Sequence, residues 1–255
     1  MIELDGASVV VAAGSGTRTI LRPTTLRLAE RRVALIGANG SGKSTLARLL
    51  NGLTLPSSGR VLVDGEDTRA HGARVRSRVG FVFSDADAQL VMPTPLEDVM
   101  LSLRRLRLSR GEREGRARRT LARFGLGDLA DVPVQALSGG QKQLLALAGV
   151  LATEPEVLVC DEPTTRLDLR WRRAVDELLG SLPQQVVLVT HDLEAAARFP
   201  RVLVVDDGAV VADGDGASSV TAYRGLVMSS VPAPAVPDRD VTDAVAPGST
   251  SPADG

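Results

Sequence analysis

The stretch Val33-Ala34-Leu35-Ile36-Gly37-Ala38-Asn39-Gly40-Ser41-Gly42-Lys43-Ser44 decides the fold of this 255-residue chain. Its first four residues are apolar, as in a buried strand, and Leu46, Leu49 and Leu50 then recur at helical spacing. Between the strand and the helix the pattern is G-x-x-x-x-G-K-S. Its glycines turn consecutive backbone N–H groups towards one centre, to which the helix adds its positive end. The stretch predicts a phosphate-binding loop in an α/β protein.

The loop offers different groups to phosphate and to metal. Lys43 supplies a point charge for β- and γ-phosphates, and the hydroxyl of Ser44 suits Mg²⁺. Lys43 is one of only two lysines, against 28 arginines. A glycine-rich turn with an accidental lysine is the alternative, but the strand before it and the helix after it favour the phosphate loop. We expect these residues to bind the nucleotide: Gly37, Ala38, Asn39, Gly40, Ser41, Gly42, Lys43, Ser44 and Thr45.

A second strand pattern ends in two carboxylates. Residues 157–160 are apolar, and Asp161 and Glu162 follow directly. The first carboxylate is placed to reach Mg²⁺, and the second to activate an attacking water molecule as a general base. Acidic residues at strand ends are common, so the pair is informative only together with the phosphate loop. We predict Ser44 and Asp161 as metal ligands and Glu162 as the base.

The segment Leu137-Ser138-Gly139-Gly140-Gln141-Lys142-Gln143 precedes an apolar helical run. A serine and two glycines at a helix start can form a second anion-binding concavity, although the same serine also fits a plain N-cap. One protomer does not need two phosphate sites for one nucleotide. The segment therefore suggests a site for a nucleotide held by a neighbouring protomer.

Composition limits the class of protein. Hydrophobic residues make up 44% and charged residues 24%, enough for a sizeable core, and the net charge of -1 argues against a general polyanion binder. Cys160 is the only cysteine, which excludes an internal disulfide and favours a reducing compartment. We expect no secretion signal, and no apolar run reaches the roughly 18 residues needed to span a bilayer. Any membrane role must then come through a partner.

Apolar runs in the second half are spaced as in a parallel α/β sheet with helices between the strands. These elements are expected at residues 157–160, 170–180, 186–190, 192–198 and 202–206.

Two lobes are expected around this core. Residues 1–30 and 59–84 read as an antiparallel β lobe with a hairpin turn at Asp64-Gly65. Residues 96–152 read as an inserted, arginine-rich helical lobe, for which a solvated face is favoured over a nucleic-acid or lipid surface. The Pro-, Ala-, Asp- and Ser-rich residues 229–255 are expected to be disordered.

These motifs resemble, in type and order, those of ABC-type ATPases. The order is phosphate loop, LSGGQ-type signature at 137–141, strand-ending Asp161-Glu162, Leu167-Asp168, and an isolated His191. The resemblance covers about residues 1–228, and the signature is highly specific to the family. It implies a P-loop ABC ATPase fold with a parallel α/β core, an antiparallel β lobe and an inserted helical lobe.

The resemblance also implies a head-to-tail dimer that holds two molecules of ATP, with Mg²⁺, at its interface. Each ATP would lie between the phosphate loop of one protomer and residues 138–141 of the other. Asp168 would bridge the protomers, and His191 would contact the γ-phosphate. Glu162 and His191 are therefore the expected catalytic residues.

Within the family, residues 79–94 are similar to those of energy-coupling-factor transporters, which import vitamins and metal ions. This stretch, together with LSGGQKQLLALAGVL and QQVVLVTHDLE, is most similar to the biotin-type ATPase subunit. The resemblance implies a peripheral ATPase on the cytoplasmic face of the membrane that drives biotin import. Its implied partners are a second ATPase protomer (a copy or a paralogue), a transmembrane coupling protein and a substrate-binding membrane protein, with no nucleic acid.

Two positions depart from the family pattern. Ser84 stands where members carry a glutamine that touches Mg²⁺ and relays to the membrane partner, so either water bridges the gap or Gln89 takes part of the role. Val11 stands where members place an aromatic residue that stacks on adenine. In the same region, Asp85 and Asp87 are expected to meet basic helices of the coupling protein.

Three alternatives stay open at this point. The first is a cobalt- or nickel-type importer. The second is a soluble ABC protein acting on DNA or ribosomes, although the segment between Lys43 and Ser138 holds no long heptad array and the chain has one ATPase unit. The third is a nucleotide switch with weak turnover, suggested by Ser84 and Val11. Glu162 and His191 argue against this third reading.

Overall fold

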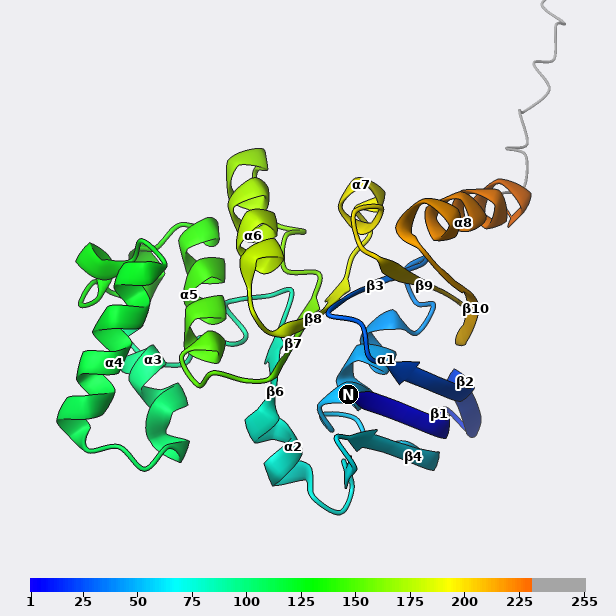
Figure 1. Ribbon diagram of the computed structural model, residues 1–255, viewed down its shortest axis with the longest axis horizontal. Coiled ribbons are helices and arrows are strands. Elements are labelled where there is room, and N and C mark those ends of the chain that lie inside the picture. The colour runs from blue at the N-terminus through cyan, green and yellow to red at the C-terminus, as the bar shows by residue number, and fades with distance from the viewer. Residues whose placement is uncertain (231–255) are drawn as a thin grey trace, which may run out of the picture.

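A six-stranded sheet forms the centre of the molecule (Figure 1). The computed structural model describes residues 1–230 of the chain. The strand order is β10-β9-β3-β8-β7-β6, and every neighbouring pair is parallel except β9 and β10. Burial of its parallel strands on both faces explains their near-continuous Val and Leu runs. The strands are β3 (Arg32–Ile36), β6 (Val79–Val82), β7 (Val157–Asp161), β8 (Gln185–Val189), β9 (Arg201–Asp206) and β10 (Ala209–Gly214).

A four-stranded antiparallel sheet, β2-β1-β4-β5, forms the β lobe. Asp64 and Gly65 make its predicted hairpin turn. Their φ angles are 46° and 81°, and a type I′ turn needs positive φ at both residues. One apolar cluster joins this sheet, the parallel sheet and the helix after the phosphate loop, so that helix is held by both sheets. The elements are β1 (Ile2–Ala13), β2 (Gly16–Leu28), β4 (Ser58–Val63), β5 (Glu66–Asp67) and α1 (Lys43–Leu50).

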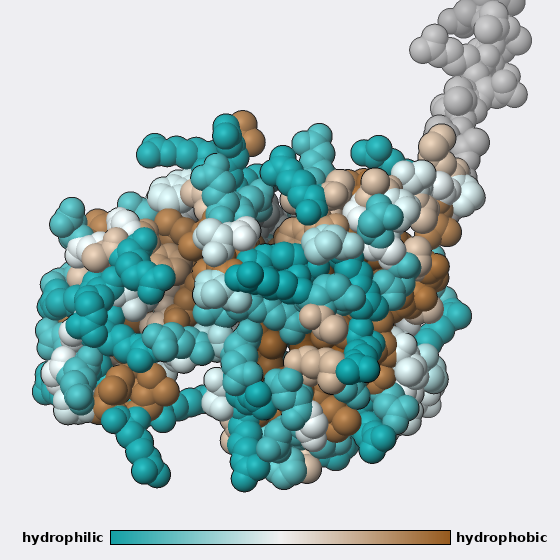
Figure 2. All heavy atoms as spheres, in the orientation of Figure 1, coloured by the Kyte–Doolittle hydropathy of each residue, from teal (hydrophilic) through white to brown (hydrophobic). Residues whose placement is uncertain are grey.

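The helical lobe stands at the other end of the molecule (Figure 1). It has its own apolar cluster, which continues onto the parallel sheet. Hydrophilic side chains cover much of the lobe in Figure 2. Arg116 pairs with Glu154 at 2.9 Å, and Arg118 with Asp131 at 3.2 Å. The lobe contains α3 (Pro95–Ser102), α4 (Arg110–Arg123), α5 (Gly139–Leu151) and 3₁₀ turns at Leu103–Arg105, Gly127–Leu129 and Val134–Ala136.

The predicted limits of the β lobe are wrong for its second segment. Strand β6 pairs in parallel with β7, and helix α2 (Gly72–Arg78) precedes it. The helix went unpredicted because it is short and buries only Val75. The apolar Val79–Val82 run belongs to the sheet that is buried on both faces.

Other helices also differ from the sequence reading. Within the expected helical lobe, α3 and α4 are separate helices with the 3₁₀ turn Leu103–Arg105 between them, and α8 (Gly216–Ser230) was not predicted. Small residues such as Gly, Ala and Ser give α8 little apolar periodicity. The helix extends past the expected boundary at residue 228, and residues 231–255, expected to be disordered, lie outside the described residues. The shorter helices after β7 are α6 (Leu169–Ser181) and α7 (Leu193–Ala196). Within residues 1–230, no helix has both the length and the apolarity needed to cross a bilayer.

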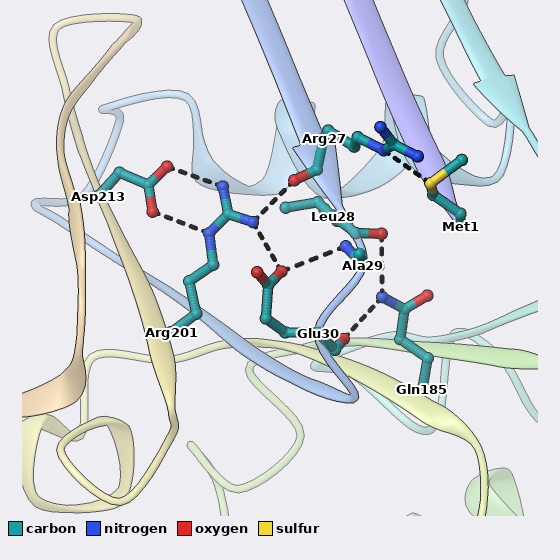
Figure 3. A network of polar contacts seen from close by, with 8 residues as sticks. All are labelled: Met1, Arg27, Leu28, Ala29, Glu30, Gln185, Arg201 and Asp213. Carbon is teal, nitrogen blue, oxygen red and sulfur yellow. Dashed lines mark hydrogen bonds and ion pairs between the residues drawn. The ribbon is translucent and has the colours of Figure 1, made fainter.

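An arginine-centred network fixes the segment that leads into β3 (Figure 3). The Arg201 guanidinium donates two hydrogen bonds of 2.8 Å to Asp213, one of 2.6 Å to Glu30 and one of 2.7 Å to the carbonyl oxygen of Arg27. These bonds raise the pKa of Arg201 above its usual value although burial opposes the shift. Gln185 donates to the Glu30 carbonyl oxygen at 2.8 Å. The network holds the β2–β3 connection on the parallel sheet, one strand before the phosphate loop.

Candidate functional site

The phosphate loop is pressed between two strands, and two of its glycines are required by space. A Cβ on Gly37 would lie 2.0 Å from the carbonyl oxygen of Val205, and one on Gly42 would lie 2.8 Å from that of Ile20. Both glycines have positive φ, 150° and 106°, a region that side chains disfavour. The loop therefore turns sharply between β3 and α1 with its backbone in contact with β9 and β2.

Two polar side chains of the loop point to an anionic ligand. The buried Lys43 Nζ donates hydrogen bonds of 2.8 Å to the carbonyl oxygens of Gly37 and Ala38, and its burial lowers its pKa. The hydroxyl of Ser41 is buried and has no hydrogen-bond partner within the described part of the chain. A buried polar group without a partner is costly, and a phosphate oxygen would satisfy both side chains.

Ser44 and Asp161 are brought together as the sequence predicts. The Ser44 hydroxyl donates to an Asp161 carboxylate oxygen at 2.9 Å, and Arg48 lies 3.8 Å from the other oxygen. Burial raises the pKa of the Asp161 carboxyl above its usual value, against the opposing effects of Ser44 and Arg48. Both residues present hard oxygen atoms, and a buried carboxylate with a raised pKa is one that a cation would stabilise. The pair therefore fits Mg²⁺.

Glu162 is held in a strained and well-directed position. Its φ is 52°, in the left-handed region that side chains rarely adopt, and its N–H donates to the carbonyl oxygen of Val189 at 3.0 Å. One carboxylate oxygen accepts from Thr165 at 2.7 Å and lies 2.9 Å from Nδ1 of His191. Burial acts to raise the pKa of Glu162, but these contacts outweigh it and the pKa is lowered. The side chain is therefore kept as a carboxylate, the form that accepts a proton.

The signature segment has local contacts of a different kind. Ser138 is the N-cap of α5, and Gln141 completes a capping box: the Ser138 N–H donates to Gln141 Oε1 at 2.8 Å, and the Gln141 N–H donates to Ser138 Oγ at 3.3 Å. A Cβ on Gly140 would lie 2.3 Å from the Trp171 ring, whereas one on Gly139 would meet nothing within 4 Å. Gly140 is thus required by packing within the chain, and Gly139 is not.

The structure does not bring the signature to the phosphate loop of the same chain. Within residues 1–230, no hydrogen bond or ion pair joins residues 138–141 to the loop, and α5 lies in the helical lobe away from α1 (Figure 1). Asp168 is exposed at the N-cap of α6, where it accepts from the Trp171 N–H at 3.0 Å. The predicted residues therefore form two groups. The loop-centred group is residues 37–45 with Asp161, Glu162 and His191. The exposed group is residues 138–141 with Asp168, in which Ser138, Gly139 and Asp168 are exposed and Gly140 is buried.

Sequence reasoning missed three residues of these groups. Arg48 lies one helical turn after Ser44, so its spacing offered a signal. Thr165 lies three residues after Glu162 in a turn, where helical spacing gives no signal. Trp171, which fills the space beside Gly140, had no comparable signal because it is distant in sequence.

The loop after β6 is tied to the rest of the chain. Asp85 pairs with Arg166 at 2.9 Å, and Asp87 with Lys142 at 2.7 Å. The amide oxygen of Gln89 accepts from the Phe83 N–H at 3.1 Å. Gln89 therefore secures the end of β6, and both acidic residues already have basic partners within the chain.

Comparison with known proteins identifies the family of the chain. A family model described as ABC transporter matches residues 23–165. Biotin transport ATP-binding protein BioM of Rhizobium etli is 46% identical over 209 residues, 82% of this chain and 93% of that protein. The dimeric ATP-binding cassette MJ0796, in a post-hydrolysis state with ADP and Pi, has a TM-score of 0.77 at 30% identity, covering 84% of this chain and 98% of its own. CbiO1 of Clostridium perfringens, part of the ABC transporter complex cbiONQ, has a TM-score of 0.74 at 30% identity, covering 89% and 93%. The chain belongs to the ABC transporter family and is an ATP-binding subunit with ATP hydrolase activity.

Proposed function

We propose that this subunit drives biotin import as the ATPase of an energy-coupling-factor transporter on the cytoplasmic face of the membrane. The observation that carries the proposal is the 46% identity to BioM over 93% of that protein. Cargo selection belongs to another subunit in such systems, so this identity supports the cargo assignment only through the resemblance of the ATPases.

The chemistry is assigned to the loop-centred group. Lys43 and the backbone N–H groups of the loop bind the phosphates. Ser44 and Asp161 would hold Mg²⁺, which would supply positive charge against the phosphates. Glu162 accepts the proton of the attacking water. His191 holds the Glu162 carboxylate at 2.9 Å and is placed to contact the γ-phosphate.

The exposed group is assigned to the nucleotide of a second protomer. Residues 138–141 begin α5. The capping box engages the N–H groups of Ser138 and Gln141, so those of Gly139 and Gly140, with the positive helix end, are the groups assigned to phosphate. Asp168 would cross the interface beside them. MJ0796 forms a dimer in its solved structure, which supports a dimeric arrangement here.

A groove between β6 and the helical lobe is proposed to dock the transmembrane coupling protein. It has a volume of about 500 Å³. Because Asp85 and Asp87 are paired within the chain, they contribute less charge to docking than their sequence suggests. Recognition then depends more on the groove itself, whose lining includes Arg76, Phe81, Phe83, Arg104, Arg105 and Leu106.

Uptake measurements test the cargo. Cells lacking this protein, complemented with the wild type or with Glu162→Gln, are supplied with labelled biotin, cobalt or nickel in parallel. We expect biotin uptake to be restored only by the wild type. Unchanged biotin uptake in the deleted cells would remove the cargo assignment, and a loss of cobalt or nickel uptake would replace it. Neither result would affect the ATPase assignment, which is measured by phosphate release with and without the membrane partners.

A further inference from the structure

Strand β2 is fixed directly against the phosphate loop. A Cβ on Gly42 would lie 2.8 Å from the carbonyl oxygen of Ile20. The turn after β9 closes the arrangement: the Gly208 N–H donates to the Ser41 carbonyl oxygen at 2.9 Å, and the Arg22 N–H donates to the Gly208 carbonyl oxygen at 2.7 Å. Residues 17–19, which precede Ile20 on the side of the β1–β2 hairpin tip, therefore lie beside the loop.

The register of the hairpin shows which of these residues share the face of the buried core. Val9 is opposite Leu21, and the next pair is Val10 with Thr19, so Ile20 is the extra residue of a β-bulge. Val9 and Leu21 are buried in the cluster that includes α1. Because side chains alternate along a strand, Val11 lies on the face of Val9.

Arg18 is the residue opposite Val11 and therefore lies on the same face. Both are exposed, Val11 with a relative accessibility of 42%. On this face of the hairpin, Val11 and Arg18 are the first pair beyond the buried pair Val9–Leu21. This pair is a short apolar side chain next to a planar cation, at the rim of the phosphate loop.

No aromatic ring lies on this hairpin, so a base bound there needs another flat partner. The six aromatic residues of the chain are elsewhere: Phe81, Phe83, Phe124, Trp171, Phe199 and Tyr223.

Arg18 has the chemistry for that task. A guanidinium group is planar, weakly hydrated and stacks on π-systems, including nucleobases. Within residues 1–230, Arg18 forms no side-chain hydrogen bond or ion pair, whereas Arg22 on the same strand pairs with Asp207. Arg18, which is nearer to the hairpin tip than Arg22, is therefore free to contact a ligand.

We propose that the adenine ring of ATP stacks on the guanidinium of Arg18, with Val11 as the apolar contact beside it. The proposal rests on ATP as the ligand of the phosphate loop and is independent of the cargo. A stacking partner attracts the base and not the phosphates, and that difference is measurable.

Calorimetry on the nucleotide-free chain separates an effect on the base from an effect on the phosphates. Mg-ATP and inorganic tripolyphosphate are titrated into the wild type and into Arg18→Ala. We expect ATP affinity to fall about 3- to 30-fold in the variant, the range of guanidinium–π contacts. Tripolyphosphate affinity should stay within about twofold, since it has no base. An equal loss for both ligands would show that Arg18 acts on phosphate and would overturn the proposal, as would an unchanged ATP affinity.

Three further variants sharpen the result. Arg18→Lys keeps the charge without the plane and should not restore ATP binding. The exchange Arg18→Thr with Thr19→Arg keeps the composition but moves the guanidinium to the other face of the strand, and should behave as Arg18→Ala. Adding Val11→Tyr to Arg18→Ala should restore affinity by supplying a ring. A wild type that binds no ATP would instead contradict the function itself.

Discussion

The loop-centred group and the signature segment differ in how their polar side chains are satisfied. Ser44, Asp161, Glu162 and His191 contact one another in pairs drawn from different elements. Ser138, by contrast, is satisfied only by its own helix, through the capping box with Gln141.

In the proposed dimer, this difference separates what one chain completes from what its partner would complete. The loop-centred group is assembled by the parallel sheet, because β3, β7 and β8 end side by side. The signature segment is a well-capped helix start that faces no group of its own chain's nucleotide site. A composite site needs this division, with one half built for chemistry and one half left accessible.

Replacing Glu162 by Gln tests the assembled half and should have the largest effect. The amide cannot accept the proton of water, so hydrolysis should fall by about 10²- to 10⁴-fold. ATP binding should persist because the loop is intact, and an ATP-dependent dimer should accumulate. Phosphate release and size-exclusion chromatography measure the two effects. Lys43→Ala is the counterpart: it should weaken ATP binding and give no such dimer. Undiminished hydrolysis in Glu162→Gln, with only monomer present, would refute the assignment.

Ser138→Arg tests the accessible half. The variant puts a bulky cation where the partner's phosphate is expected, so turnover should fall by about 10²- to 10³-fold while ATP binding to the monomer is kept. The lost cap should also cost about 1 kcal/mol of stability. Ser109→Arg is the control, because Ser109 caps α4 through an equivalent capping box with Glu112. It should cost similar stability with normal turnover. Equal loss of monomer binding in Ser138→Arg would place the signature in the site of its own chain.

The sequence predicts a feature of either half well when the residues that form it lie in one short segment. The phosphate loop, the Asp161-Glu162 strand end and the cap at Ser138 each lie in one short segment, and their local structures were predicted. The contact of Ser44 with Asp161 was also predictable, because parallel strands end at one edge of a sheet.

What the sequence does not predict depends on contacts between distant segments. The Trp171 ring against Gly140 and the Asp85–Arg166 pair join elements whose relative positions only the packed core determines. Helix α2 and strand β6 show the same limit, since a run of four apolar residues does not reveal which sheet it joins.

Alanine at the two signature glycines sharpens the comparison within the accessible half. Gly140→Ala forces a Cβ against Trp171, so the free energy of unfolding should fall by about 1–3 kcal/mol, as measured by thermal or denaturant unfolding. Gly139→Ala meets open space and should keep or raise stability. A loss of turnover in Gly139→Ala without a loss of stability would show that Gly139 serves the partner's nucleotide. Equal destabilisation of both variants would contradict the packing described here.

The smallest effect is expected from two carboxyls, that of the buried Asp161 beside the phosphate loop and that of the half-buried Asp176 in α6. Burial raises the pKa of Asp161 in β7 and that of Asp176 in α6, where Asp192 adds to the shift. The folded chain therefore keeps these protons to higher pH than the unfolded chain does. The stability that they contribute is complete below about pH 3.9 and is lost as pH rises through the folded pKa values.

At pH 7 to 8, Asp161→Asn and Asp176→Asn should each raise the Tm of the nucleotide-free chain by up to about 4 °C, with the gain vanishing near pH 4. Only Asp161→Asn should abolish hydrolysis, because Asp161 alone adjoins Ser44 at the loop. If Asp161→Asn lowers the Tm at pH 7 while Asp176→Asn raises it, Ser44 and Arg48 stabilise the Asp161 carboxylate even without a cation. The burial of Asp161 would then no longer support a Mg²⁺ site.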